Sequence, residues 1–275
     1  MADIYGSHFE FAGVSSRQWD LIFVNINTSR ATQLGGAKEG VAIYSKSVNK
    51  RYLIDDDYSA SPVTFDVEIM TETERCLDPW DRRKIEKWLF NHGDYRRLYL
   101  DMLDDCRGET YEYVDGVCKR NYLNCRLINP ERIEGNGGTI GYKATLEADS
   151  NMFWQEPIIK KFVLTNGGSS TNITVDVDTD LNEFIYPRVT IQVGSAGGDI
   201  VIANNHDDSS RLTRFVDMSP LSSVTMKGEI NYVSGQYYLN FADRNFIRLL
   251  DGKNTFTILG DVETIEFEYS ARRAM

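Results

Sequence analysis

The chain has few of the residues that bind metal ions or carry out redox chemistry. It contains four cysteines and three histidines among 275 residues. Cys76, Cys106, Cys118 and Cys125 form no C-x-x-C pair, and the histidines are scattered along the chain. Zinc sites and redox motifs need such residues at short, fixed spacings. We therefore expect reduced, partly buried thiols, no metal site and no redox motif.

Long hydrophobic runs and an excess of positive charge are also missing. The longest apolar run near the start is "LIFV" at 21–24, far short of the roughly 20 residues that span a bilayer, and no charged-then-apolar signal region is seen there. Acidic residues outnumber basic ones by 41 to 30, for a net charge of −11, whereas nucleic-acid and anionic-membrane surfaces are basic. These features predict synthesis in the cytoplasm, no membrane span and no sequence-specific nucleic-acid partner.

Catalytic motifs are missing as well. "GNGGTIG" at 135–141 has the wrong spacing for a dinucleotide loop and joins two expected strands rather than a strand and a helix. Neither a G-x-S-x-G elbow nor an H-E-x-x-H motif occurs. Asp55, Asp56 and Asp57, or Asp104 with Asp105, could supply the carboxylate pair of a glycosidase, but nothing selects two of them. We predict that the chain is not an enzyme and nominate no catalytic or cofactor-binding residue.

One acidic stretch has the order of a calcium loop. "DVDTDLNE" at 176–183 spaces Asp176, Asp178 and Asp180 correctly, yet Leu181 stands where an EF-hand needs glycine. On a strand the three carboxylates would share one face. A weak calcium site and an exposed acidic strand therefore remain as alternatives, and an EF-hand is excluded.

Alternation of apolar and polar residues is what the chain has in abundance. "SPVTFDVEI" at 61–69 places its apolar residues on one face of a strand, and "RIEGNGGTIGYKATLEA" at 132–148 reads as a hairpin that turns at 135–138. Shorter alternating segments follow, among them "YPRVTIQV" at 186–193 and a closing pair of strands predicted to form a hairpin at Gly260–Asp261. The pattern indicates a mainly β protein.

The periodicity is interrupted once, in the middle of the chain. "DSNMFWQEP" at 149–157 has no alternation and is closed by a proline, as expected of a connection between domains. We predict two domains, residues 1–150 and residues 151–275. The spacing of strands and turns in the second favours a β-sandwich.

A single helix interrupts the strands of the first half. In "DPWDRRKIEKWLFNHG" at 78–93, Asp78 is placed to cap the helix, Pro79 suits its first turn and Gly93 its end. The spacing predicts a helix over 79–92 with an apolar stripe of Ile85, Trp88 and Leu89.

The basic residues of this helix allow two interpretations. Arg82, Arg83 and Lys87 form a solvated surface, with Arg82 and Glu86 at ion-pair spacing, or they contact an acidic neighbour or nucleic acid. Isolated charge runs usually belong to solvated surfaces. Both interpretations stay open at this point.

Four stretches together resemble the distal tail protein family of long-tailed phages, which have non-contractile tails. They are "FEFAGVSSRQWDLIFVNINTS" at 9–29, "DPWDRRKIEKWLFNHGDYRRLYLDMLDD" at 78–105, "LEADSNMFWQEP" at 146–157 and "FIRLLDGKNTFTILGDVETIEFEYSARR" at 246–273. The order and spacing of the stretches carry the resemblance. The chain departs from the family at Asp251, where proline is frequent before the glycine of the closing strands.

This resemblance implies an N-terminal β-barrel-like domain with one α-helix, which assembles into a hexameric ring, and a C-terminal galectin-like β-sandwich. It implies a structural subunit of the virion tail tip, in a baseplate or tail-tip assembly. One face of the ring would meet the tail-tube protein and the other the tail-tip hub, or tail-associated lysin. DNA would pass through the lumen, where the acidic character of the chain would repel phosphate.

Two other functions remain as alternatives. The second half could act as a carbohydrate-binding tail adhesin that contacts the host cell wall through exposed aromatic residues such as Tyr237 and Tyr238. A tail-associated enzyme would need a perturbed acid or base in a cleft.

Overall fold

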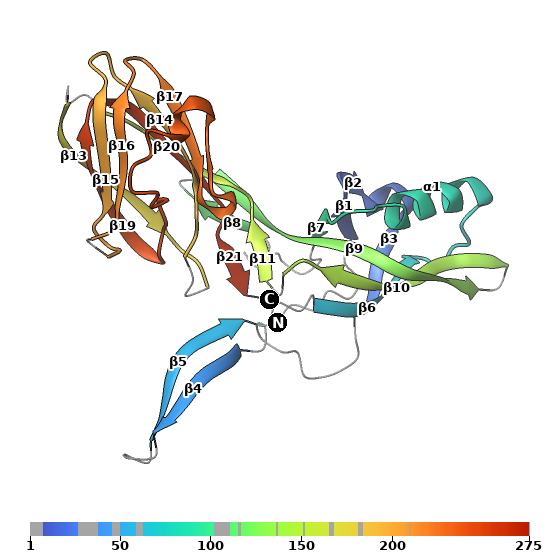
Figure 1. The fold of residues 1–275 in the computed structure, drawn as a ribbon. Coiled ribbons are helices and arrows are strands. Elements are labelled where there is room, and N and C mark those ends of the chain that lie inside the picture. The colour runs from blue at the N-terminus through green and yellow to red at the C-terminus, as the bar shows by residue number, and fades with distance from the viewer. Residues whose placement is uncertain are drawn as a thin grey trace. The chain divides into compact units, whose positions relative to one another are not determined.

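The fold is mainly β, as the alternation predicts. The computed structural model describes residues 8–26, 38–45, 50–58, 63–101, 111–114, 117–135, 137–150, 152–164, 168–180, 184–208 and 210–274 (Figure 1). The chain divides into two compact units. Unit 1 comprises residues 1–154 and 273–275, and unit 2 comprises residues 155–272.

Unit 1 is built on a ten-stranded antiparallel sheet, whose main path runs β2–β1–β7–β9–β10–β6–β3. Its strands are β1 (His8–Phe11), β2 (Val14–Ser15), β3 (Leu21–Ile26), β6 (Val63–Thr71), β7 (Arg96–Asp101), β8 (Tyr111–Val114), β9 (Val117–Gly135), β10 (Gly138–Ala148), β11 (Met152–Gln155) and β21 (Arg272–Ala274). A 3-10 turn, η1 (Ser16–Trp19), precedes β3, and β4 (Lys38–Ser45) pairs with β5 (Lys50–Tyr58) in a separate ribbon. In the described residues, the ends of the main path do not pair, so the sheet is open rather than a closed barrel.

The expected hairpin of the first half is confirmed. β9 and β10 pair from Gly135 and Gly138 at the turn, and β10 also pairs with β6. In that second pairing Ile69 lies opposite Tyr142, and both side chains are buried. The glycine-rich turn therefore closes a hairpin, and its middle residue, Asn136, lies outside the described residues.

Helix α1 (Pro79–Phe90) begins where its capping residues predict. The Asp78 carboxylate accepts hydrogen bonds from the Trp80 and Asp81 backbone N–H groups, both at 2.8 Å, and Pro79 takes the first helical position. The helix ends two residues before the expected 92, with Asn91 as its C-cap at φ −99° and ψ 41°. Gly93 does not adopt a left-handed conformation, so it is not the expected glycine stop.

The apolar stripe of α1 closes the core of unit 1. Ile85, Trp88 and Leu89 are buried in one hydrophobic cluster with residues of β1, β3, β6, β7, β9 and β10. The Trp88 indole N–H donates to the Phe11 backbone carbonyl at 2.7 Å. The predicted orientation of the helix is thus confirmed, with its apolar stripe against the sheet.

Gly141 of β10 is a position where the sheet has no room for a side chain. It lies opposite Met70 of β6 and Ile133 of β9, and a Cβ there would collide with the Ile69 carbonyl oxygen. We expect Gly141→Ala to destabilise unit 1 by about 1 to 3 kcal/mol. Gly93→Ala is the control, because a Cβ at Gly93 meets no atom within 4 Å.

Denaturant unfolding followed by tryptophan fluorescence measures this difference. All four tryptophans of the chain lie in residues 1–154, so their emission reports on unit 1. A Gly141→Ala variant as stable as the Gly93→Ala variant would contradict the close approach of β6 to β10.

Unit 2 is a β-sandwich of two antiparallel sheets. The five-stranded sheet has the order β12–β20–β14–β17–β18, and the four-stranded sheet has the order β13–β19–β15–β16. The strands are β12 (Ile158–Val163), β13 (Gly168–Val177), β14 (Arg188–Val193), β15 (Gly198–Asn204), β16 (Leu212–Met218), β17 (Ser223–Lys227), β18 (Tyr232–Val233), β19 (Gly252–Gly260) and β20 (Val262–Tyr269), with 3-10 turns η2 (Gly228–Ile230) and η3 (Gly235–Tyr238). Phe256 and Phe267, one from each sheet, pack with ring centroids 5.0 Å apart.

The predicted hairpin at Gly260–Asp261 is wrong. β19 pairs with β13 and β15, whereas β20 pairs with β12 and β14, so these consecutive strands belong to different sheets (Figure 1). Gly260 has φ +108°, which favours glycine. The turn carries the chain from one layer of the sandwich to the other. Alternation could not reveal this, because it determines the face that a residue occupies and not the neighbouring strand.

The chain leaves the sheet of unit 1 and later returns to it. β11 pairs with β9 and with β21, which follows all of unit 2 in the sequence. The two ends of unit 2 meet where the Gln155 N–H donates to the Ala271 carbonyl at 2.9 Å. Unit 2 is therefore an insertion between two neighbouring strands of unit 1.

Candidate functional site

The exposed side of α1 combines an aromatic residue with cations. Trp80, Arg83, Lys84 and Lys87 follow one another at helical spacing and are exposed, Trp80 to 72%. We call these four residues the α1 outer face. The Lys84 Nζ atom lies 4.0 Å from the Asp81 Oδ1 atom, and this ion pair is on the solvent side of the helix. Sequence analysis missed Trp80, although its spacing from Arg83 and Lys87 places it on this face.

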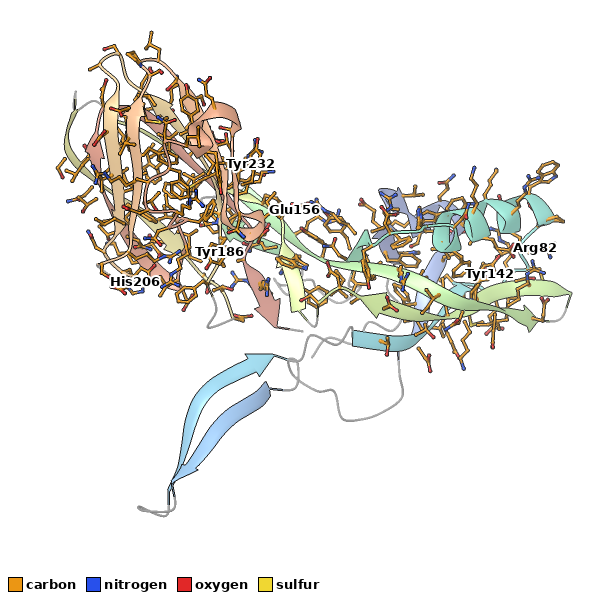
Figure 2. All side chains as sticks on the ribbon, viewed as in Figure 1. Arg82, Tyr142, Glu156, Tyr186, His206 and Tyr232 are labelled. Carbon is orange, nitrogen blue, oxygen red and sulfur yellow. The ribbon has the colours of Figure 1, made fainter. Side chains whose placement is uncertain are left out.

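The third predicted basic residue, Arg82, lies elsewhere on the helix. It is half-buried near Tyr142, and Figure 2 labels both residues. Its expected partner, Glu86, instead accepts hydrogen bonds from the Arg132 guanidinium at 2.9 Å. The Tyr142 hydroxyl donates to the same carboxylate at 3.5 Å, and burial raises the pKa of Tyr142. This cluster ties α1 to the β9–β10 hairpin.

The sheet of unit 1 presents acidic side chains away from its core. Asp66 and Glu68 occupy the outward positions of β6. The register places Lys143 opposite both Glu68 and Glu131, so the three acids are neighbours on one surface with one cation between them. We call Asp66, Glu68 and Glu131 the acidic sheet face.

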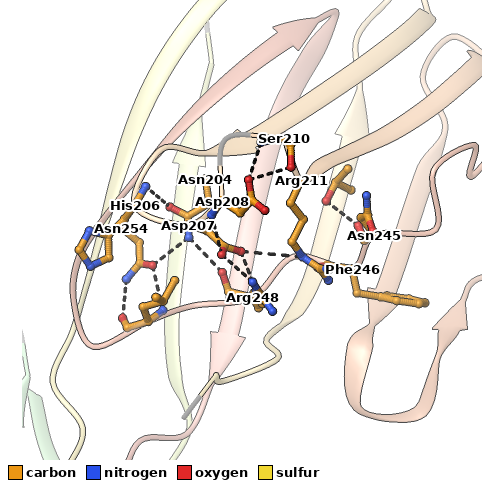
Figure 3. A network of polar contacts seen from close by, with 12 residues as sticks. Asn204, His206, Asp207, Asp208, Ser210, Arg211, Asn245, Phe246, Arg248 and Asn254 are labelled. Atoms are coloured by element: carbon orange, nitrogen blue, oxygen red, sulfur yellow. Dashed lines mark hydrogen bonds and ion pairs between the residues drawn. The ribbon is translucent and has the colours of Figure 1, made fainter. Parts of the chain in front are cut away.

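Unit 2 contains a compact ion-pair network between the β15–β16 connection and the segment before β19 (Figure 3). The Arg248 guanidinium donates to both carboxylate oxygens of Asp207, at 2.6 and 2.7 Å. The Arg211 Nε atom lies 3.8 Å from the Asp207 Oδ2 atom. These hydrogen bonds hold the pKa of the Asp207 carboxyl below its usual range. The centroid of the Phe184 ring lies 3.6 Å from the Arg248 guanidinium carbon.

The side-chain amides of Asn204 and Asn254, next to this network, are hydrogen-bonded within unit 2. Asn254 is fully buried, and its side-chain oxygen accepts from the Asn204 amide at 2.9 Å and from the Leu250 backbone N–H at 3.0 Å. The adjoining cavity measures about 10 Å³, room for about one water molecule. The network therefore links the β15–β16 connection to the segment before β19 within unit 2.

A larger open groove of about 290 Å³ lies on the five-stranded sheet of unit 2. It is lined by Arg188, Thr225, Lys227, Ile230, Tyr232 and Ser234. The two tyrosines predicted as a carbohydrate platform do not line it. Tyr237 instead hydrogen-bonds to Ser222, which lowers the pKa of the Tyr237 hydroxyl, and the Arg244 guanidinium lies 5.1 Å from the Tyr238 ring.

The predicted acidic candidates do not form a metal cluster in the part of the chain that the structure describes. Asp176, Asp178 and Asp180 are exposed, and the register places Asp176 opposite Lys253. Asp104 and Asp105 lie outside the described residues, and Asp55 to Asp57 lie in β5. Asp176 lies near the end of β13, whereas Asp178 and Asp180 follow that strand, so the three carboxylates do not all lie on one strand as expected.

Two of the four cysteines differ in exposure. Cys76 is exposed, whereas Cys125 is buried, and its burial raises the pKa of its thiol. Cys106 lies outside the described residues. Among the helices that the structure describes, none is long and apolar enough to cross a membrane.

Sequence models of two domain families match the chain, one after the other. The first is described as a phage tail protein N-terminal domain and matches residues 4–150. The second is described as a phage tail C-terminal domain and matches residues 154–269. No curated protein matches the chain.

A solved structure of a phage protein shares the fold of this chain. The Dit protein of phage SPP1, described as a paradigm of the hub adsorption apparatus in phages that infect Gram-positive bacteria, matches with a TM-score of 0.62. The identity is 9%, over 97% of this chain and 98% of that one. Two structures of the phage P2 baseplate in its activated conformation, with calcium and with strontium, match at 9% identity with TM-scores of 0.46 and 0.49, over 96% of this chain and 98% and 97% of theirs.

Proposed function

Because the chain belongs to the phage tail protein family, we propose that it is a structural subunit of a phage tail tip that assembles into a hexameric ring. The resemblance to distal tail proteins that the sequence indicates is confirmed by the matched domain families and the shared fold. In the proposed assembly, the ring joins the tail-tube protein to the tail-tip hub, or tail-associated lysin, and DNA passes through its lumen.

The end-to-end correspondence with the SPP1 Dit protein carries this proposal. The shared fold covers 97% of this chain and 98% of that one, so both units have counterparts in a protein described as part of a hub. The net charge of −11 suits a wall that DNA passes, because acidic groups repel phosphate.

The proposal assigns no catalytic residue, cofactor or metal to the chain. It places the protein in the virion tail tip after synthesis in the cytoplasm of the bacterial host. The division at residue 150 into a ring-forming domain and a galectin-like sandwich is part of the same proposal.

The carbohydrate-binding adhesin is the less favoured function. Tyr237 is engaged by Ser222, and neither it nor Tyr238 lines the open groove of unit 2. A sugar platform needs an aromatic face next to polar groups in one concave site, and these two tyrosines do not provide it.

Light scattering coupled to size-exclusion chromatography tests the ring on the full chain. We expect a species with about six times the 31.4 kDa mass of the chain at high protein concentration, because closed rings of identical subunits form by mass action. Electron microscopy of that species should show a ring with a central opening. A monomer at every concentration would contradict the proposal.

A further inference from the structure

Unit 1 carries opposite charges on two opposite sides. The α1 outer face is basic and presents Trp80, and the acidic sheet face presents Asp66, Glu68 and Glu131. We propose that these two faces bind each other between neighbouring copies of this chain, with Trp80 as the apolar anchor. The inference rests on the proposed ring and names its contact surfaces.

The geometry of β6 and α1 puts the two faces on opposite sides of the sheet. Val67 and Ile69 point into the core that Ile85 and Trp88 of α1 close. Successive side chains of a strand point to opposite faces, so the acidic positions of β6 face away from the helix. The α1 outer face lies on the far side of the helix from this core.

The α1 outer face is held rigidly. The Asp78 cap fixes the first turn through its two hydrogen bonds of 2.8 Å. The Arg132–Glu86 contact and the buried Trp88 fix the middle and the end of the helix. A preorganised helix backbone loses little conformational freedom on binding, so only the exposed side chains of Trp80 and its neighbouring cations are ordered on docking.

The exposure of Trp80 has no explanation within the described fold. Its side chain is 72% exposed, and it belongs to the residue type that, with tyrosine and arginine, dominates the energetics of protein interfaces. Arg83 beside it is a second such residue, and neither Arg83 nor Lys87 forms an ion pair with another described residue. The composition of this face is that of an interface.

A second copy of the chain is the occupant that the charges select. Copies with a net charge of −11 repel one another, and a basic face against an acidic one offsets that repulsion where the copies touch. Complementary patches at different places on one molecule give head-to-tail contacts, which generate rings when the rotation closes. Opposite faces of unit 1 therefore fit a ring rather than an isolated dimer.

Two full-length variants separate the faces. The helix variant carries Trp80→Ala, Arg83→Gln and Lys87→Gln, and the sheet variant carries Asp66→Asn, Glu68→Gln and Glu131→Gln. The control carries Ile159→Ala, Lys161→Gln and Lys253→Gln in unit 2, which also removes one exposed apolar residue and two cations. Thermal melting followed by circular dichroism verifies that each variant folds.

Sedimentation equilibrium gives the result. We expect each face variant to associate at least about 30-fold more weakly than the parent, and the control to associate like the parent. Each face variant keeps one intact face, so an equimolar mixture of the two should form one-to-one pairs and nothing larger. Raising salt from about 0.05 to about 0.5 M should weaken association of the parent.

The outcomes distinguish the contact from the ring itself. If the parent forms a ring and both folded face variants form the same ring, the contact is wrong and the ring stands. If the mixture contains only monomers while each variant alone is monomeric, the two faces do not bind each other. If the parent is monomeric at every concentration, the proposed function fails and the contact fails with it.

Discussion

Replacing Trp88 with alanine is expected to destabilise unit 1 by about 3 to 5 kcal/mol, the usual range for removing a buried aromatic side chain. Trp88 is 8% exposed and stacks on Phe9, with ring centroids 5.7 Å apart and planes within 9°. The Trp88 ring also packs against Trp19, with ring centroids 5.0 Å apart. The substitution leaves a cavity between α1 and the sheet and removes the indole donor of the Phe11 carbonyl.

The same helix supplies the control for this measurement. Trp80→Ala removes the same side chain from a position that is 72% exposed, so the monomeric unit should lose less than about 1 kcal/mol. Trp88→Phe retains most of the packing and loses the hydrogen bond, for an expected loss of about 1 to 2 kcal/mol. Denaturant unfolding of dilute protein provides all three values. Equal effects of Trp80→Ala and Trp88→Ala would contradict the assigned orientation of α1.

Replacing Asp207 with alanine is expected to destabilise unit 2 by about 1.5 to 3 kcal/mol, because it leaves two partly buried cations without the carboxylate that accepts their hydrogen bonds. The Asp207 side chain is 7% exposed, and the side chains of Arg248 and Arg211 are 18% and 27% exposed. Without the Asp207 carboxylate, the Arg248 and Arg211 guanidinium groups would lie close together with no negative charge between them. Unit 2 contains no tryptophan, so far-ultraviolet circular dichroism, and not tryptophan emission, must follow its unfolding.

An exposed ion pair in the same unit supplies the control. Arg188 and Glu268 lie 3.1 Å apart with side chains 50% and 34% exposed, and such pairs contribute about 0 to 1 kcal/mol. Glu268→Gln should therefore change the free energy of unfolding little. A similarly small effect of Asp207→Ala would show that the network contributes no more than a surface pair.

The ion pair between Asp207 and Arg248 also predicts how acid affects the stability of unit 2. Because the folded pKa of Asp207 lies below its unfolded value, its contribution to stability is fully present above an unfolded pKa of about 3.9. The contribution is lost as pH falls through the folded pKa. The stability difference between the parent and Asp207→Asn should therefore be constant above about pH 5 and shrink below about pH 4.

Local signals account for what the sequence could predict. The start of α1 follows from Asp78 and Pro79, which act within one turn, and the β9–β10 hairpin follows from the glycines between two alternating segments. The end of α1 was less predictable, since a glycine near a helix end adopts the left-handed conformation only in some contexts.

Pairing between residues far apart in the chain accounts for what the sequence could not predict. Whether β19 neighbours β20 depends on strands brought from elsewhere in the chain, and alternation is the same in both arrangements. Asp207 and Arg248 are 41 residues apart, and neither lies in a motif. Of the proposed contact, Arg83 and Lys87 were visible as a basic stretch, whereas the acidic sheet face required the register of β6, β10 and β9.

The insertion of unit 2 also affects the order of folding on the ribosome. β11 emerges before unit 2, but its partner β21 is translated only after roughly 118 further residues, about 6 to 24 s at ~5–20 residues per second. During that interval the nascent sheet of unit 1 lacks one strand, while all strands of unit 2 become available in sequence. The two units are therefore completed almost together, because β20, an inner strand of unit 2, ends at Tyr269, only two residues before β21 begins.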